Sequence, residues 1–153
     1  AQDQAEENLK TLQNSSGGTL AQYQNLVKIL QAYRDEDQQT AVLLYVDTDW
    51  SVLNDGVLNE TVAWIQKDMA ENGYTVLMNM GDETLAAGDA AKAEEYYQKS
   101  LQIKADNPEV IYKLGMAYVT AGDQQTATQY FTDIIMNYPN SDYVDDAKTQ
   151  RGY

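Results

Sequence analysis

Acidic side chains are the residues of this chain with the clearest capacity for chemistry, and their densest cluster is Asp47-Thr48-Asp49 with Asp55 close behind. Carboxylate oxygens are the ligands that calcium prefers, but a helix-loop-helix calcium loop needs glycine at its sixth position and glutamate at its twelfth. Counted from Asp47, these positions hold Val52 and Leu58. The acidic cluster therefore indicates a solvated helix end, and we expect no metal site.

Catalytic side chains of the common kinds are scarce. The chain has no His and no Cys, which removes the usual general base, the thiol nucleophile, the disulfide framework and nearly every zinc site. The acidic pairs Glu94-Glu95 and Asp145-Asp146 would need to converge in a cleft to cleave a glycoside, and exposed helix faces are the simpler interpretation. No glycine-rich phosphate loop occurs either. We therefore expect no enzyme and no cofactor.

The charge balance excludes one large class of partner. The chain carries 10 Lys+Arg against 24 Asp+Glu, a formal net charge of −14. A field of this sign repels nucleic-acid phosphates and anionic membrane surfaces. The charge would serve solubility or select a basic partner.

The elements that position these residues are nearly all helical. In the N-terminal half, glycine, proline, asparagine and aspartate predict a polar helix over 2–13, a break over 14–18, and helices over 19–34, 38–53 and 57–71. The helix over 19–34 has its apolar residues on one stripe at helical spacing: Leu20, Tyr23, Leu26, Val27, Leu30 and Tyr33. Turns at Asn54-Asp55-Gly56 and Asn72-Gly73 would end the last two helices. The apolar run 41–46 is short, and its helical flanks favour helix over strand.

The C-terminal half predicts two helical hairpins, 74–87 with 90–104 and 108–121 with 124–137, and a last helix from about Ser141. The hairpins repeat at a spacing of 34 residues. The matched positions are Gly81 with Gly115, Ala87-Gly88-Asp89 with Ala121-Gly122-Asp123, Ala93 with Ala127, Tyr96-Tyr97 with Tyr130-Phe131, and Leu101 with Ile135. Glycine can end a helix with positive φ, and the following aspartate can cap the next one.

These hairpins resemble the tetratricopeptide repeat family over about 74–141. In that family the first helix carries a large residue, then Leu-Gly, then an aromatic residue. Ile111, Leu114-Gly115 and Tyr118 stand at these places, and Leu77, Met80-Gly81 and Thr84 precede them by one repeat. The resemblance implies an all-α fold of antiparallel helical hairpins stacked in a right-handed superhelical array. It also implies that Ala93 and Ala127 lie where helices cross, with Tyr97 and Phe131 beside them.

The resemblance divides the chain into an N-terminal polar helix and spacer, 1–18, and one repeat domain, 19–153. The parts of the domain are clear repeats at 74–107 and 108–141, a degenerate hairpin at 19–50, an irregular helix at 57–71 and a capping helix at 141–153. The degenerate hairpin is predicted because Asp37 to Ala41 is identical in sequence to Asp123 to Ala127. An alternative register, with hairpins at 6–39 and 40–73, keeps the strict period but loses the cap at Asp37.

Members of this family bind partners in a concave groove lined by the first helices of successive hairpins. At the matching positions this chain has Met78, Asn79, Asp82, Tyr112, Lys113, Met116 and Val119. Mixed aromatic, thioether and amide groups suit an extended or helical peptide. Met116 and Val119 fit the packing between repeats equally well. Some family members bind chaperone C-terminal carboxylates, but the side chains at 78, 82, 112 and 116 do not favour that ligand.

The C-terminal string Phe131-x6-Tyr138-Pro139-Asn140-Ser141-x5-Ala147 resembles a subgroup of these repeats common in bacterial cell-envelope proteins. Absent thiols fit an exported protein. The chain begins at Ala1 rather than Met, so we expect a signal peptide or membrane anchor upstream, with 14–18 as a short spacer. Membrane contact is expected only through such an anchor.

The sequence therefore predicts a protein–protein interaction scaffold that binds a peptide or protein segment, located outside the cytoplasm and membrane-anchored. The alternative is a self-assembly module, in which the acidic surface and the C-terminal helix pack against a second copy. The partner's identity does not follow from the residues.

Overall fold

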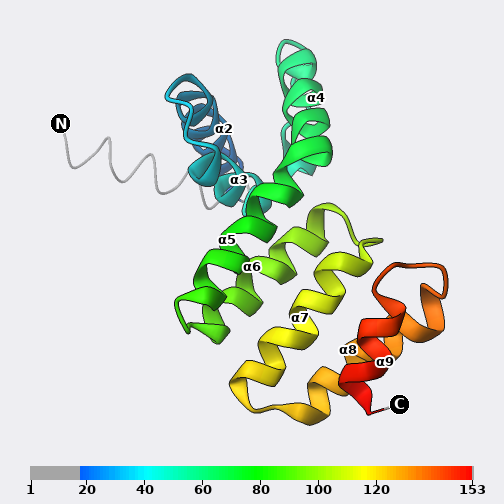
Figure 1. The fold of residues 1–153 in the computed structure, drawn as a ribbon. Coiled ribbons are helices and arrows are strands. Elements are labelled where there is room, and N and C mark those ends of the chain that lie inside the picture. Colours follow the sequence, from blue (N-terminus) through cyan, green and yellow to red (C-terminus); the bar gives the residue numbers. More distant parts are fainter. Residues whose placement is uncertain (1–17, 153) are drawn as a thin grey trace. The chain divides into compact units, whose positions relative to one another are not determined.

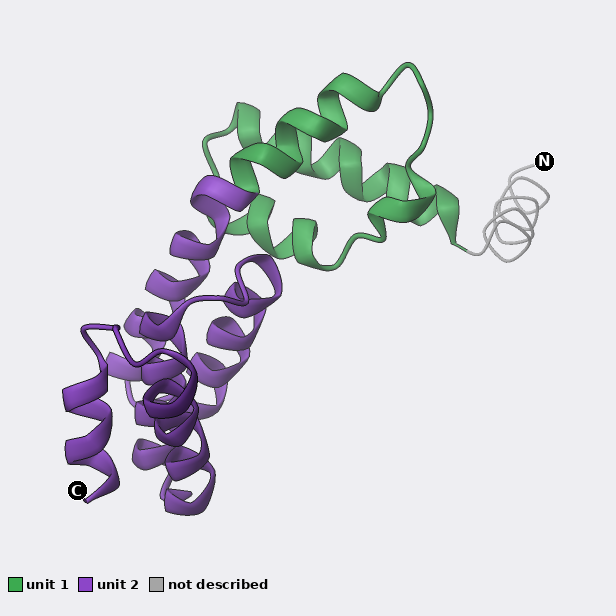
Figure 2. Cartoon of the chain, turned by 90° about the vertical axis from the view of Figure 1, so that its right-hand side faces the viewer, with its two compact units in different colours: residues 1–69 green, residues 70–153 purple. Residues whose placement is uncertain are grey.

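The computed structural model describes residues 18–152 of the 153-residue chain. The chain divides into two compact units, residues 1–69 and residues 70–153, shown in different colours in Figure 2. Every regular element in the described part is helical, as the sequence predicts. The expected helix over 2–13 lies outside the described residues. A single array over 19–153 stays a prediction.

Unit 1 contains helices α2 (Thr19–Arg34), α3 (Gln38–Val46) and α4 (Asn59–Asp68), with a short 3₁₀ helix, η1 (Trp50–Val52), before α4 (Figure 1). The expected helix over 38–53 was too long. It ends at Val46, and the Asp49 side chain instead caps η1 by accepting a hydrogen bond from the Ser51 N–H at 3.1 Å. The run 41–46 is helical, as its flanks indicate.

The buried face of α2 differs from the predicted stripe. Leu26, Ile29 and Ala32 are buried, whereas Val27 and Leu30 are 54% and 38% exposed. The sequence of α2 contains two apolar stripes about one residue apart around the helix. Helical periodicity identifies both stripes, but only the packing partner decides which one is buried.

The expected helix end at Asn72-Gly73 was also wrong. A π-helical turn, η2 (Met69–Gly73), follows α4, and α5 begins directly at Tyr74. Gly73 has φ −64°, an ordinary helical value, so it does not terminate the helix. Met69 is 3% exposed, and burial of this apolar side chain outweighs the weak helix propensity of the two residues.

Unit 2 contains five successive helices: α5 (Tyr74–Ala86), α6 (Ala90–Ile103), α7 (Pro108–Ala121), α8 (Gln124–Asn137) and α9 (Val144–Arg151). Each packs on the next along the chain, as the ribbon in Figure 1 shows. The helix bounds lie within about one residue of the predicted ones, except that α9 begins three residues after Ser141.

The turns between paired helices form as the repeated Ala-Gly-Asp sequence predicts. Gly88 and Gly122 have φ of 90° and 86°, a left-handed conformation that glycine adopts without steric cost. Asp89 and Asp123 each accept a hydrogen bond from a backbone N–H three residues later. Asp37 makes the same contact with Thr40 at the start of α3.

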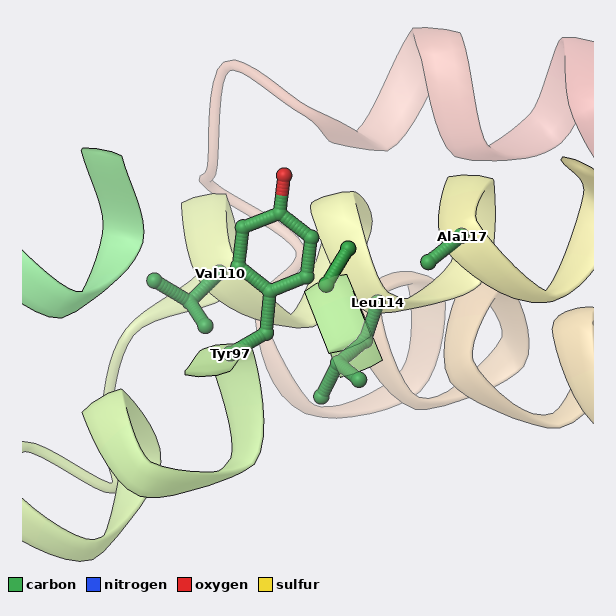
Figure 3. Close-up of a cluster of buried hydrophobic side chains, with 5 residues drawn as sticks. Tyr97, Val110, Leu114 and Ala117 are labelled. Carbon is green, nitrogen blue, oxygen red and sulfur yellow. The ribbon is translucent and has the colours of Figure 1, made fainter. Parts of the chain in front are cut away.

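The core of unit 2 depends on aromatic rings that lie against glycine. A Cβ atom on Gly115 would lie 2.5 Å from Cε1 of Phe131, and one on Gly81 would collide with Tyr97 in the same way. Ala93 and Ala127 are fully buried. Figure 3 shows the Tyr97 ring beside Val110 and Leu114, which join α6 to α7. The small residues of the repeat therefore allow the helices to approach closely.

Candidate partner-binding face

Three polar side chains from three helices of unit 2 meet at Asp82. The Lys113 ammonium group of α7 lies 2.8 Å from Asp82 Oδ2 and 3.0 Å from Oδ1, and the Tyr97 hydroxyl of α6 donates to Oδ1 at 2.6 Å. The carboxylate of α5 therefore joins the first helix of one repeat to the first helix of the next. We call the surface formed by α5 and α7 around this cluster the α5–α7 face.

The Asp82 cluster lies between core and solvent. The Tyr97 residue is fully buried, whereas the side chains of Lys113 and Asp82 are 25% and 39% exposed. Burial, and then the neighbouring Asp82 carboxylate, raise the pKa of Tyr97 far above its usual value, so its hydroxyl stays protonated and remains a donor. The buried Tyr97 hydroxyl thus fixes the Asp82 carboxylate on the core side, while the charged groups of Asp82 and Lys113 are partly exposed to solvent.

The other predicted groove residues divide into two groups. Asn79 is exposed on α5, one turn before Asp82. The larger side chains are half-buried and pack against the core clusters of unit 2: Met78, Tyr112, Met116 and Val119. Met116 and Val119 therefore contribute to packing, one of the two roles that the sequence left open. Whether these residues also contact a ligand stays a prediction.

Tyr112 connects the α5–α7 face to the C-terminal helix. Its ring lies 5.7 Å from the Phe131 ring and 5.4 Å from the ring of Tyr143, which directly precedes α9. Burial, with a smaller contribution from the Asp146 charge, raises the pKa of Tyr112. Two adjacent residues of α7 therefore contact the helices on either side of it. Lys113 binds Asp82 of α5, and Tyr112 contacts Tyr143 at the start of α9.

The remaining acidic residues that drew attention in the sequence have structural contacts. Asp49 caps η1, and the Asp55 side chain accepts the Val57 N–H at 2.9 Å. Within residues 18–152, no group of three or more acidic side chains is arranged to hold a metal ion. The arrangement around Asp82 offers one carboxylate, one ammonium group and an amide at Asn79, which can bind polar groups of a ligand.

The sequence placed Asp82 and Lys113 on the same face without indicating that they form an ion pair, and it assigned Tyr97 only to packing. One signal was present. The repeat aligns Asp82 with Met116 and Tyr97 with Phe131, so the hydroxyl and the carboxylate occur together in one repeat and are both absent from the next.

Unit 2 contains stacked helical hairpins with a 34-residue period, aromatic rings packed against glycine, and turns capped by aspartate. Residues 84–150 match the model of the tetratricopeptide repeat family. This matched segment is a little under half of the chain and covers the turn after α5, helices α6 to α8 and most of α9. The structure and the match together identify an all-α, tetratricopeptide-like array in this part of the chain. A search among curated proteins found no significant match.

Tetratricopeptide repeats generally mediate protein–protein interactions and are typically scaffolds without catalytic activity. Protein partners are therefore the class of ligand that the family supports. In the described part of the chain, the helices are too short or too polar to cross a lipid bilayer.

Proposed function

We propose that unit 2 is an interaction scaffold that binds a peptide or protein segment along the α5–α7 face. The Asp82–Lys113 ion pair is the observation that carries the proposal, because it places two partly exposed charges of opposite sign at the junction of consecutive first helices. The same surface carries the exposed amide of Asn79 and the half-buried thioether and aromatic groups of Met78 and Tyr112. Such a mixture offers both polar anchors and apolar contact area.

The ion pair also bears on the charge of the ligand. Because Asp82 neutralises Lys113, this lysine is not a free receptor for a C-terminal carboxylate. The repeat residues 74–153 carry 12 acidic and 6 basic side chains, a net charge of −6. A segment with Lys or Arg would be attracted to this field. The Asp82 carboxylate has about four acceptor sites, of which Tyr97 and Lys113 occupy three, so it can accept one further charge-assisted hydrogen bond from such a segment. We therefore propose a basic segment as the ligand.

A selection from a random peptide library displayed on phage tests this function. The selected peptides should be rich in Lys or Arg, and their affinity for the full chain is measured by fluorescence anisotropy. Asn79→Ala and Gln98→Ala form a matched pair of variants, because both remove an exposed amide from the same helical hairpin, Asn79 on α5 and Gln98 on α6. Loss of a hydrogen bond of about 0.5–1.5 kcal/mol corresponds to roughly 2- to 10-fold weaker binding for Asn79→Ala only.

Equal affinities for the two variants and the wild-type chain would place the ligand elsewhere. Selection of acidic or purely apolar peptides would contradict the proposal that the ligand is basic. The same two variants would then test whether those peptides bind at the α5–α7 face or elsewhere. Asp82→Asn should weaken binding further than Asn79→Ala, because it leaves Lys113 as an unpaired positive charge that repels a basic side chain.

We also propose that the protein works outside the cytoplasm of a bacterium, tethered at the cell envelope by a segment ahead of residue 1. The resemblance of the string at 138–141 to envelope repeats and the absence of Cys support this location. The complete reading frame should contain an upstream apolar stretch of about 20 residues, or a shorter one that ends at a lipid-acceptor cysteine. A native protein that lacks both and fractionates with the cytosol would refute the location but not the binding role.

A further inference from the structure

In two places of the chain glycine follows a carboxyl or amide side chain, Asp55-Gly56 and Asn72-Gly73. In such a pair the backbone nitrogen of the glycine can attack the side-chain carbonyl carbon of the residue before it, because glycine has no Cβ to obstruct the approach. The new bond closes a succinimide ring, and water leaves from Asp or ammonia from Asn. Water then reopens the ring, and opening at the main-chain carbonyl reroutes the backbone through the side chain as isoaspartate. By sequence Asn72-Gly73 is the more reactive pair, because a carboxylate has to take up a proton before water can leave.

The helical backbone keeps the two reacting atoms of Asn72-Gly73 apart. Asn72 lies in η2, and Gly73 is buried with φ −64° and ψ −38°. In a helix each Cα–Cβ bond tilts toward the helix N-terminus, whereas the nitrogen of the next residue lies toward the C-terminus. A helical N–H also donates along the helix axis to a carbonyl of the preceding turn. The Asn72 side chain is therefore directed away from the nitrogen that would attack it.

The loop between η1 and α4 brings the corresponding atoms of Asp55-Gly56 together. Asp55 Oδ1 accepts the Val57 N–H at 2.9 Å, which turns the side chain forward along the chain. The ring that this hydrogen bond closes contains the Gly56 nitrogen, so the Asp55 carboxyl carbon stays beside that nitrogen. Residues 54–57 are exposed, and within the described part of the chain the Gly56 N–H donates no hydrogen bond. A Cβ atom at Gly56 would have no neighbour within 4 Å, so the loop has room for the succinimide.

We propose that Asp55 is a site of spontaneous conversion to isoaspartate in the folded protein, and that its helix protects Asn72. The Gly56 nitrogen bonds to the Asp55 carboxyl carbon, and the nitrogen's proton leaves with the carboxyl OH as water. The water that reopens the ring restores the original mass. The product has one extra carbon in the main chain between η1 and α4, and its free carboxylate is attached to Cα. The loop is thereby lengthened, and the hydrogen bond from the Val57 N–H to the Asp55 side chain is lost.

Asp55→Asn in the full chain tests the protection, because both pairs are then Asn-Gly and differ only in their backbone. The variant is incubated folded in neutral buffer, and the deamidation of positions 55 and 72 is followed by peptide mapping with mass spectrometry. Position 72 reacts only after its helix opens locally, and about 1.4 kcal/mol of opening free energy slows the reaction roughly 10-fold. We expect position 55 to react at least about 10-fold faster than position 72 in the folded variant. In concentrated urea the two rates should become similar. Circular dichroism confirms that the variant is folded.

The wild-type chain gives a second measurement, in mildly acidic buffer where part of the carboxyl is protonated. Isoaspartate at position 55 is detected because endoproteinase Asp-N no longer cleaves before it. Gly56→Ala is the matched variant, because its Cβ atom meets no neighbour in the fold but obstructs the attacking nitrogen. Isoaspartate should form several-fold more slowly in this variant.

Three results would overturn the proposal. One is equal deamidation at positions 55 and 72 in folded Asp55→Asn, because the helix would then give no protection. Another is a folded wild-type chain that keeps Asp55 intact under conditions in which the urea-unfolded chain forms isoaspartate. The third is an unchanged rate in Gly56→Ala, which would show that the Gly56 nitrogen is not the attacking group.

Discussion

At the scale of single residues, unit 2 depends on pairs in which one member has almost no side chain. The rings of Tyr97 and Phe131 occupy the volume that a Cβ atom would take at Gly81 and Gly115. Both rings are fully buried, so neither can move into solvent to make room. The glycine is needed for space here, since its helical backbone needs no left-handed φ.

Gly115→Ala should therefore destabilise the protein, although alanine is the better helix former. Overpacking costs about 1–3 kcal/mol, and the gain in helix propensity returns about 0.5–1 kcal/mol. We expect a lower midpoint in thermal unfolding followed by circular dichroism. Gly56→Ala is the control, because a Cβ atom there has no neighbour within 4 Å and φ is not positive. A Gly115→Ala protein as stable as the Gly56→Ala protein would contradict the packing argument.

At the scale of elements, one local device is used three times. Asp37, Asp89 and Asp123 each begin a second helix of a hairpin and accept a backbone N–H three residues later. The Thr40 and Thr126 hydroxyls add a second hydrogen bond to the carboxylates of Asp37 and Asp123 at 2.6 Å. These hydrogen bonds hold the pKa of both carboxyls below its usual value of 3.8.

Acid titration of folding stability tests this cap. Because the pKa of Asp123 is lower in the folded chain, its contribution to stability is complete above pH 3.8 and is lost as pH falls through the folded value. Asparagine caps helices without titrating. The free energy of unfolding, measured in urea, should thus fall more steeply below pH 4 in the wild-type chain than in Asp123→Asn. If the free energy of unfolding changed equally with pH in both proteins, the charge of the Asp123 carboxylate would add nothing to the stability that a neutral asparagine cap provides.

Local sequence signals predicted the bounds of a helix well where one short-range interaction determines where the helix begins or ends. The Ala-Gly-Asp turns predicted where α5 and α7 end and where α6 and α8 begin, because glycine φ and the aspartate cap act within a few residues. The stripe of α2 and the junction at Asn72-Gly73 failed because distant burial decided them. The α5–α7 face was partly predictable in the same way. The repeat placed Asp82 and Lys113 on one surface, but their contact spans 31 residues and depends on how α5 and α7 are spaced.

At the scale of the whole molecule, the net charge of −14 is shared equally between the two units, −7 over residues 1–69 and −7 over 70–153. Self-repulsion of this size opposes association of identical copies. An interaction scaffold also has to keep its binding face open. Both considerations favour a monomer over the self-assembly alternative.

Multi-angle light scattering on the full chain at micromolar concentration should therefore give the mass of one copy, near 17.1 kDa. The measurement is repeated at low and high salt, because salt screens the repulsion between acidic surfaces. A dimer that persists at both salt concentrations, and in which Lys113 is protected from acylation, would favour self-assembly through the α5–α7 face.

The pairing of Tyr97 with Asp82, and of Phe131 with Met116, has a consequence for the inheritance of the repeats. The two residues of each pair lie on either side of an Ala-Gly-Asp turn. Because both repeats share this turn sequence, unequal recombination between the repeats would join them there. A crossover there would place Tyr97 below a methionine, leaving a buried hydroxyl without its acceptor at a cost of about 1–3 kcal/mol. The reciprocal product would place a carboxylate above a phenyl ring. Repeats of this chain can therefore be duplicated whole, whereas hybrid repeats joined at the turn are penalised.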